Sequence, residues 1–318
     1  MTTTLEPPLR PQVEFLNHRK VSWQKVKRAR YLFYQRFHYA YPGAIRSLRH
    51  RLVVVPAARY GDQQLCNHRL RVSPDVVVAR SRLDDFGNRI LEFEAPKIRK
   101  EVTFETLTEV ERVGSGNPPL MESVDTELYL EPTPLTQPDT KIRETARALQ
   151  AGADNERDLA SAINRWVHGA MRYGFGATGV GTPAARALEI GEGLCQDYAH
   201  IMLALCRAVG LKARYVSGHM LAEGGTHAWV EVLPDGEQGP YALAFDPTNN
   251  RHPGLNYVTV AVGRDYRDVA PTSGSYQAPF SGELTATKQA GLTAVEYDDG
   301  RVIGDRTRFD SSLPDIED

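Results

Sequence analysis

The sequence predicts an α+β protein in two parts: a β-rich N-terminal part, then a part in which one buried helix packs on an antiparallel sheet. Two observations predict this class. Apolar residues follow the two-residue period of strands as far as about residue 113, and the helical period of about 3.6 residues from about residue 139. A chain of 318 residues is also long enough to fill two separate cores.

Residues 28–113 are expected to form a β-sandwich-like domain. Short apolar runs recur along this segment, among them Leu52–Val55, Ile90–Phe93 and Val102–Phe104. Asp85–Asn88 separates two such runs as a turn would, and short strands at regular spacing are typical of a sandwich. The preceding residues 1–27 contain three prolines and a basic stretch, and they are expected to form an N-terminal arm.

A linker is predicted at residues 114–138, where Gly114–Pro119 and Glu131–Pro134 interrupt any regular period. Residues 139–297 should form the second domain. Its first clear helix is an apolar stripe from Leu159 to Met171, with Asp154 or Asn155 as the N-cap. Residues 298–318 are acidic and poor in apolar side chains, which predicts a loosely ordered tail.

The central helix of the second domain is predicted to begin at Cys195 and to end before Gly210. Its apolar residues are spread around most of the circumference, which is the pattern of a buried helix. Strands are expected after it, at residues 213–217, 226–233, 241–246 and 257–262. One central helix on a mostly antiparallel sheet is an α+β arrangement.

Composition restricts the partners and the compartment. A net charge of −2 gives no general attraction to nucleic acid or to an anionic membrane, and no run of about 18 apolar residues could span a bilayer. The three cysteines cannot all pair, and none belongs to a C-x-x-C unit. The first residues also lack the apolar core of an export signal. A cytoplasmic protein with reduced thiols is therefore expected.

Cys195 is the candidate nucleophile. It follows Gly191–Gly193, which does not continue a helix easily, so its sulfur should lie at a helix N-terminus. The partial positive charge there favours a thiolate, and unpaired backbone N–H groups could hold a developing oxyanion. A buried structural cysteine is the alternative, because this residue type is often buried.

His227 and Asp246 complete a possible triad. They lie on strands that flank the loop Pro234–Pro240, and folding these strands back about residue 236 or 237 would place the two residues directly opposite each other. Directly opposed residues on one face are close enough for a carboxylate to accept a hydrogen bond from an imidazole. The register must be correct to the residue, because a slip of one would turn a side chain to the other face.

The trio resembles that of the transglutaminase-like cysteine enzymes, in particular their bacterial branch with an added N-terminal β-domain. The specific part of the resemblance lies in Gly191–His200, Thr226–Val232, Phe245–Asn249 and Gly263–Tyr266. It implies a papain-like core with the cysteine opening the central helix. By the same resemblance Cys195 is the nucleophile, His227 the general base and acid, and Asp246 the carboxylate that orients the histidine.

Three further residues are candidates for substrate binding. Tyr173 lies where relatives often have a tyrosine, and Gln196 matches the bacterial motif. Asp197 matches this motif too, but helix capping is the preferred interpretation for it. Trp229, two residues after His227, could shield a thioester from solvent. A core position is an equal alternative for Tyr173 and Trp229.

A cysteine acyl-transfer enzyme that cleaves amide or peptide bonds is the favoured function, with a protein or peptide as substrate. Transfer of the acyl group to an amine is one alternative, and a non-catalytic interaction module is another. No cofactor is expected. No carboxylate cluster has the spacing of a calcium loop, and the trio lacks the fourth ligand of a structural zinc site. The substrate's identity, the role of the β-domain and the oligomeric state stay open.

Overall fold

The computed structural model describes residues 13–74, 77–114, 126–221, 226–237 and 239–304. The chain divides into two compact units. Unit 1 comprises Met1–Arg59, Gln63–Gly114 and Pro271–Asp318, and unit 2 comprises Tyr60–Asp62 and Ser115–Ala270. The second domain was expected to extend to residue 297, and this boundary needs correction. The segment after Ala270 forms strands that pair with strands of unit 1.

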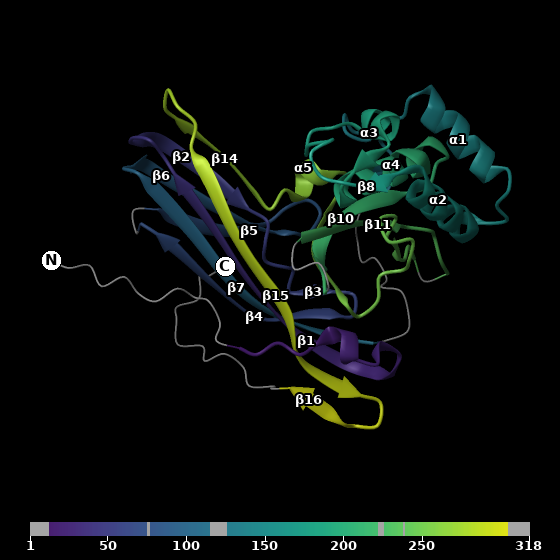
Figure 1. Ribbon diagram of the computed structural model, residues 1–318, viewed down its shortest axis with the longest axis horizontal. Helices are drawn as coiled ribbons and strands as arrows, with labels where there is room; N and C mark the ends of the chain where they lie inside the picture. Colours follow the sequence, from purple (N-terminus) through teal and green to yellow (C-terminus); the bar gives the residue numbers. More distant parts are fainter. Residues whose placement is uncertain (1–12, 75–76, 115–125, 222–225, 238, 305–318) are drawn as a thin grey trace. The chain divides into compact units, whose positions relative to one another are not determined.

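Unit 1 contains two antiparallel sheets. The six-stranded sheet has the order β16-β15-β1-β7-β4-β3, and the four-stranded sheet has the order β14-β2-β6-β5 (Figure 1). In the first, β1 pairs along its length with β7 on one side and β15 on the other. The bounds are β1 Val26–Ala40, β2 Ile45–Leu52, β3 Arg59–Tyr60, β4 Gln63–Ser73, β5 Val78–Leu83, β6 Arg89–Ile98, β7 Glu101–Val113, β14 Thr272–Gln277, β15 Glu283–Tyr297 and β16 Val302–Gly304.

The two sheets of unit 1 share one apolar core. Phe37 and Phe104 are register partners on β1 and β7, and they cluster with Leu48 of β2 and Phe93 of β6. The rings of Phe93 and Phe104 lie 4.6 Å apart between centroids, one from each sheet. Inward-facing apolar residues from both sheets make this unit a β-sandwich, as the spacing of its strands predicted.

The ends of the predicted domains differ in detail. Two short 3-10 helices, η1 His18–Lys20 and η2 Trp23–Lys25, lie in the expected N-terminal arm, and η3 Glu127–Tyr129 lies in the expected linker. Of the expected acidic tail, residues 305–318 lie outside the described part of the chain. The short strand β16 lies in the same predicted tail and pairs with β15.

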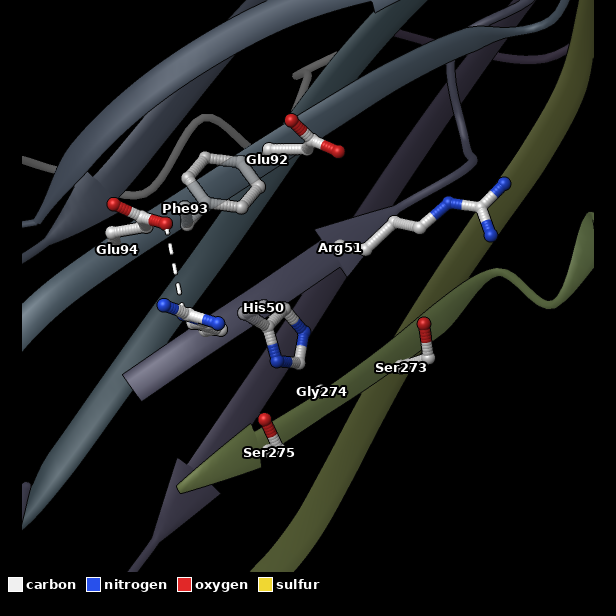
Figure 2. Close-up of a pocket in the computed structure, with 9 residues that line it drawn as sticks. His50, Arg51, Glu92, Phe93, Glu94, Ser273, Gly274 and Ser275 are labelled. Atoms are coloured by element: carbon white, nitrogen blue, oxygen red, sulfur yellow. Dashed lines mark ion pairs between the residues drawn. The ribbon is translucent and has the colours of Figure 1, made fainter. Parts of the chain in front are cut away.

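A shallow hollow of about 310 Å³ lies in unit 1, over β2, β6 and β14 (Figure 2). Arginines and glutamates alternate along it, and Arg49 lies 3.8 Å from Glu94. Their opposite charges compensate each other, and His50 at this place is buried, which lowers its pKa to about 4. The hollow therefore presents no strong net charge, and the thiol, imidazole and carboxylate of the predicted site all lie in unit 2.

Unit 2 is a four-stranded antiparallel sheet with the order β12-β11-β10-β13, on which the helix α4 packs. Three further helices surround α4 (Figure 1). The bounds are α1 Thr140–Gln150, α2 Glu156–Ala170, β8 Arg172–Tyr173, α3 Ala184–Ile190, β9 Glu192–Gly193, α4 Cys195–Ala208, β10 Ala213–Met220, β11 Thr226–Val232, β12 Leu243–Phe245, β13 Tyr257–Gly263 and α5 Tyr266–Val269. The predicted central helix and its antiparallel sheet are confirmed, and Asn155 is the N-cap of α2.

A buried arginine near the end of α4 forms hydrogen bonds with several segments of unit 2. The guanidinium of Arg207 donates to the carbonyl oxygens of Tyr129 at 3.0 Å, Ala213 at 3.1 Å and Arg264 at 2.7 Å, and to the hydroxyl of Thr136 at 2.6 Å. Its side chain is only 6% exposed. Each bond joins α4 to a segment distant in sequence or to the following strand, so this one side chain fixes how the helix lies among them.

Candidate active site

Cys195 is the first residue of α4, and its side chain is partly accessible. The chain reaches it through Gly193, where an added Cβ would lie 2.5 Å from Oδ2 of Asp197. A glycine is therefore required at this close approach. The backbone N–H groups of a first helical turn have no partners within the helix, which places potential oxyanion donors beside the thiol. The predicted start of the helix at this residue is confirmed.

The other two cysteines lie in different surroundings. Cys206 is fully buried in α4, and burial raises the pKa of its thiol to about 12. Cys66 belongs to β4 in unit 1. Of the three free thiols, Cys195 is therefore the one that combines partial exposure with a helix N-terminus.

The side chain of Asp197 caps the first turn of α4. Its Oδ2 accepts a hydrogen bond from the backbone N–H of Leu194 at 2.8 Å and another from the hydroxyl of Thr178 at 2.7 Å. Asp197 is completely buried, and burial raises the pKa of its carboxyl group. The capping role expected for Asp197 is confirmed, and the bond to Thr178 ties a distant loop to the start of the helix.

His227 lies on β11, the strand against which α4 packs. Its Nε2 lies 2.9 Å from Oδ2 of Asp246, and both side chains are fully enclosed. Burial opposes ionisation of Asp246, but hydrogen bonds from His227, Tyr257 and Asn249 outweigh it and lower its pKa. An ionised carboxylate can only accept, so Nε2 carries the proton and the lone pair of the neutral ring is on Nδ1.

The carboxylate of Asp246 is held by several donors besides the histidine. The hydroxyl of Tyr257 donates to Oδ2 at 2.6 Å, and the side-chain amide of Asn249 donates at 2.8 Å. The backbone N–H groups of Thr248 and Asn249 donate to Oδ1 at 3.0 and 3.2 Å. Asp246 is thus fixed in position independently of His227, which lets it orient the imidazole.

The register that brings these two residues together differs from the expected one. The ladder between β11 and β12 pairs Val230 with Phe245 and Val232 with Leu243, so continuing it would place Asp246 opposite Trp229 rather than opposite His227. The shift is two residues along one strand, and side chains two residues apart share a face. His227 and Asp246 are consequently diagonal neighbours on one face, and the direct opposition predicted from the hairpin is wrong.

Trp229 lies beneath the histidine. Its indole stacks on the His227 ring at 6.2 Å between centroids, and it meets Tyr257 edge-on at 5.4 Å. The residue is 1% exposed, so it packs in the core rather than facing solvent. Gly218, the register partner of His227, makes room for the indole, because a Cβ there would lie 2.5 Å from its Cη2.

Gln196 and Tyr173 are both at least partly exposed. Gln196 is partly exposed and follows Cys195 in the first turn of α4. Tyr173 is 46% exposed, and it pairs in parallel with Gly193, two residues before the nucleophile candidate. Both are thus accessible and close to Cys195 along the chain or through pairing, and their contact with a substrate stays a prediction.

Sequence reasoning missed two tyrosines near the thiol, Tyr215 on β10 and Tyr266 on α5. Burial raises the pKa of both phenols, and the negative charge of a Cys195 thiolate raises both further. His200 fixes the position of Tyr266, because its Nε2 accepts a hydrogen bond from the backbone N–H of Tyr266 at 3.2 Å. The available signal was the run Gly263–Tyr266, which the resemblance noted without a role.

Within the described residues, no group of three histidine, cysteine, aspartate or glutamate side chains is placed to hold a metal ion. None of the described helices is both long enough and apolar enough to cross a membrane.

Two segments of the chain match models of protein families. Residues 143–239 match the transglutaminase-like superfamily, and residues 31–111 match the bacterial transglutaminase-like N-terminal region. The chain belongs to the transglutaminase-like superfamily. The first match lies within unit 2, and the second lies in unit 1 except for residues 60–62, which belong to unit 2. The two matches confirm the family resemblance that the motifs around Cys195 and His227 indicated.

Other proteins resemble the chain in sequence or fold. The uncharacterized protein ML0607 of Mycobacterium leprae is 30% identical over 225 residues, which cover 64% of this chain and 77% of that protein. The uncharacterized protein Rv2569c of Mycobacterium tuberculosis is 38% identical over 130 residues, or 37% and 40% of the two chains. A crystal structure described as a "putative cysteine protease" from Cytophaga hutchinsonii has a TM-score of 0.64 at 19% identity, covering 84% of this chain and 98% of that one. This structural likeness confirms the fold class, a papain-like transglutaminase core with an N-terminal β-rich region.

Proposed function

We propose that this member of the superfamily is a cysteine-dependent acyl-transfer enzyme that cleaves amide or peptide bonds through a thioester. In this proposal Cys195 is the nucleophile, His227 the general base and acid, and Asp246 the residue that orients the imidazole. The observation that carries the proposal is the fully enclosed pair formed by His227 of β11 and Asp246, which directly follows β12. The helix of Cys195 packs on β11. A thiol, an imidazole and a buried carboxylate on adjoining elements are the groups that this chemistry needs.

The proposed reaction begins when Nδ1 of His227 accepts the proton of the Cys195 thiol. The sulfur then attacks the carbonyl carbon of the substrate, and N–H groups at the start of α4 hold the negative oxygen that forms. The C–N bond breaks as His227 returns the proton to the departing amine, which leaves a thioester on Cys195. Water or a second amine then adds to the thioester, giving its proton to His227, and the C–S bond breaks as the sulfur regains a proton.

Asp246 contributes by keeping its charge close to the imidazole. Because its hydrogen bonds lower its pKa, it stays ionised while His227 becomes the imidazolium, and its charge stabilises that cation. Trp229 covers the ring from the core side, so this buried residue is proposed to hold His227 rather than to touch the substrate.

Hydrolysis is the preferred outcome, with a polypeptide as the substrate. The fold shared with the Cytophaga hutchinsonii protein, whose printed name refers to a cysteine protease, supports a hydrolase. Transfer to an amine is the second candidate, because the same thioester serves both reactions. The cytoplasmic location expected from the three cysteines stays a prediction.

The test uses intact-mass spectrometry and peptide analysis. Wild type and Cys195→Ala are incubated with short glutamine-containing and amide-containing peptides, with and without a primary amine. A product that gains water only with the wild type supports a hydrolase, and a product that gains the amine supports a transferase. Cys66→Ala is the matched control and should behave as the wild type.

A second measurement separates an enzyme from a non-catalytic module. Iodoacetamide at mildly acidic pH should modify Cys195 well before Cys206, because the thiol of Cys206 is buried and its pKa is raised to about 12. His227→Ala should slow the modification of Cys195 at that pH. Equal and slow labelling of all three cysteines would contradict the proposed enzyme.

A further inference from the structure

The loop between α2 and α3 exposes apolar side chains close to the proposed nucleophile. Phe175 is 81% exposed, Val180 is 52% exposed and Tyr173 is 46% exposed. Within the described residues of unit 2, every strongly exposed large apolar side chain belongs to this loop. A feature confined to one loop in this way differs from single apolar residues scattered over a surface, which are ordinary.

This loop is attached to the start of α4 at two points. Near its beginning, β8 pairs in parallel with β9, and the N–H of Gly174 donates to the carbonyl oxygen of Gly193 at 3.1 Å. In its middle, the hydroxyl of Thr178 donates to Asp197 at 2.7 Å. Both anchors lie within two residues of Cys195. The apolar side chains are therefore part of a segment that the nucleophile helix itself holds.

The aromatic residues of the loop also contact one another and the helix. The rings of Tyr173 and Phe175 meet edge-on at 5.9 Å, and Tyr173 lies 6.5 Å from Tyr198, one turn of α4 after the thiol. The apolar surface thus continues from Phe175 through Tyr173 to the nucleophile helix.

The composition of the loop argues against an ordinary solvated surface. Residues 173–182 include no charged side chain, although charged residues make up 25% of the chain. Glycines occupy four of these ten positions, and at Gly176, Gly179 and Gly181 an added Cβ would meet nothing within 4 Å. At Gly174 the side chain of Glu192 fills that space. A solvated loop normally carries polar or charged residues, whereas an uncharged apolar loop beside a reactive group is suited to bind an apolar ligand group.

We propose that residues 173–182 contact the substrate and select polypeptides with a large apolar or aromatic side chain near the scissile amide. This inference rests on the proposed function and names its substrate class. Phe175 and Val180 would cover that side chain when the peptide is bound, and the fixed distance from the loop to Cys195 would place the amide at the thiol. A polar side chain at the same position would lose water there without gaining a partner.

The experiment measures how fast peptidyl chloromethyl ketones alkylate Cys195. One series carries phenylalanine at each of the first three positions before the reactive group, and the matched series carries serine at those positions. Intact mass gives the second-order rate, and the rate with iodoacetamide serves as the reference for thiol reactivity. Wild type should react at least about tenfold faster with one phenylalanine probe than with its serine counterpart, the range by which an apolar pocket discriminates.

Two variants are compared with the wild type. One is the double variant Phe175→Ser/Val180→Ser, and the other is the matched control Leu83→Ser. Both changed sites are exposed, and Leu83 is an exposed apolar residue on β5 of unit 1. The double variant should lose most of the preference for phenylalanine, and Leu83→Ser should keep it. A wild type without preference, or a double variant that keeps it, would overturn the inference.

The outcomes distinguish this inference from the proposed function. If iodoacetamide modifies Cys195 readily but neither peptide series reacts, or both react equally, the substrate class is wrong while the reactive thiol stands. If Cys195 is as slow as the other cysteines toward every reagent, the proposed enzyme fails, and the selectivity fails with it.

Discussion

Nε2 of His227 lies 2.9 Å from Oδ2 of Asp246, although the two residues are diagonal neighbours rather than ladder partners. The carboxylate is held in this position by Tyr257 and Asn249 as well, through bonds of 2.6 and 2.8 Å. Its geometry therefore does not depend on the histidine. A change of Asp246 to its amide would keep its shape but remove its charge and replace one accepting oxygen by an NH₂ group that faces other donors.

Replacing Asp246 by asparagine should reduce amide cleavage by about 10⁴-fold, the loss seen when the carboxylate of a comparable triad becomes an amide. An amide can no longer stabilise the imidazolium or require that Nε2 carry the proton. Tyr257→Phe removes one donor to Asp246 and should cost much less. Rates for purified variants, with circular dichroism to check the fold, give the comparison. Equal losses in both variants would mean that the charge of Asp246 has no special role.

His200 should make the stability of unit 2 depend on pH between about pH 7 and pH 5. Burial lowers its pKa from the ordinary 6.5 to about 3, with Arg207 and Arg267 adding to the effect. Between these values the unfolded chain binds a proton that the folded chain does not, so stability is full above pH 6.5 and is lost as the pH falls. The loss at pH 5 is about 2 kcal/mol.

Urea unfolding of wild type and His200→Gln at both pH values measures this contribution. Glutamine retains an oxygen that can accept the N–H of Tyr266, but it does not titrate. The variant should therefore lose less stability than the wild type on acidification. An identical loss in both proteins would show that His200 is not the group responsible.

Arg207→Met should lower the free energy of unfolding by about 3 kcal/mol or more, because each buried acceptor left without a donor costs about 1–3 kcal/mol. Three carbonyl oxygens and one hydroxyl would lose their donor at once. Arg165→Met, on the exposed side of α2, is the control and should change stability by less than about 0.5 kcal/mol. Similar urea midpoints for the two variants would contradict the role given to Arg207.

Gly218→Ala should destabilise unit 2 by about 3 kcal/mol or prevent its folding. The new methyl group would lie 2.2 Å from the carbonyl oxygen of Val258 and 2.5 Å from the indole of Trp229. Gly169→Ala in α2 is the matched control, because nothing lies within 4 Å of its added Cβ. Thermal melts should show a loss for the first variant and no loss for the second. A stable and active Gly218→Ala protein would mean that the strand can shift freely there.

The start of α4, the helix that begins at Cys195, could be predicted because local sequence determines it. Glycines before Cys195 and a continuous apolar run after it describe a buried helix without reference to the rest of the chain. The family could also be predicted, since its motifs lie in short segments. In the same way, the cap of α2 depends only on Asn155 and the residues that follow it.

Register and strand partners could not be predicted in the same way. The loop between β11 and β12 sets their pairing, and its length allows two arrangements that keep His227 and Asp246 on one face. The strand β15 has the right pattern for either unit, and only its long-range pairing with β1 assigns it to unit 1. The roles of His200 and Arg207 likewise depend on bonds to residues far away in sequence.

The pairing of β1 with β15 also has a consequence for how the protein is made. During synthesis, β1 and its partner β7 emerge first, and all of Ser115–Ala270 follows before β15 becomes available. Until then the far edge of β1 has a row of backbone groups that could pair with another growing chain. A nascent chain that stopped after Ala270 would contain every residue of unit 2 but an unfinished sandwich. A pause of the ribosome in that interval would lengthen the time for which this edge of β1 lacks its partner.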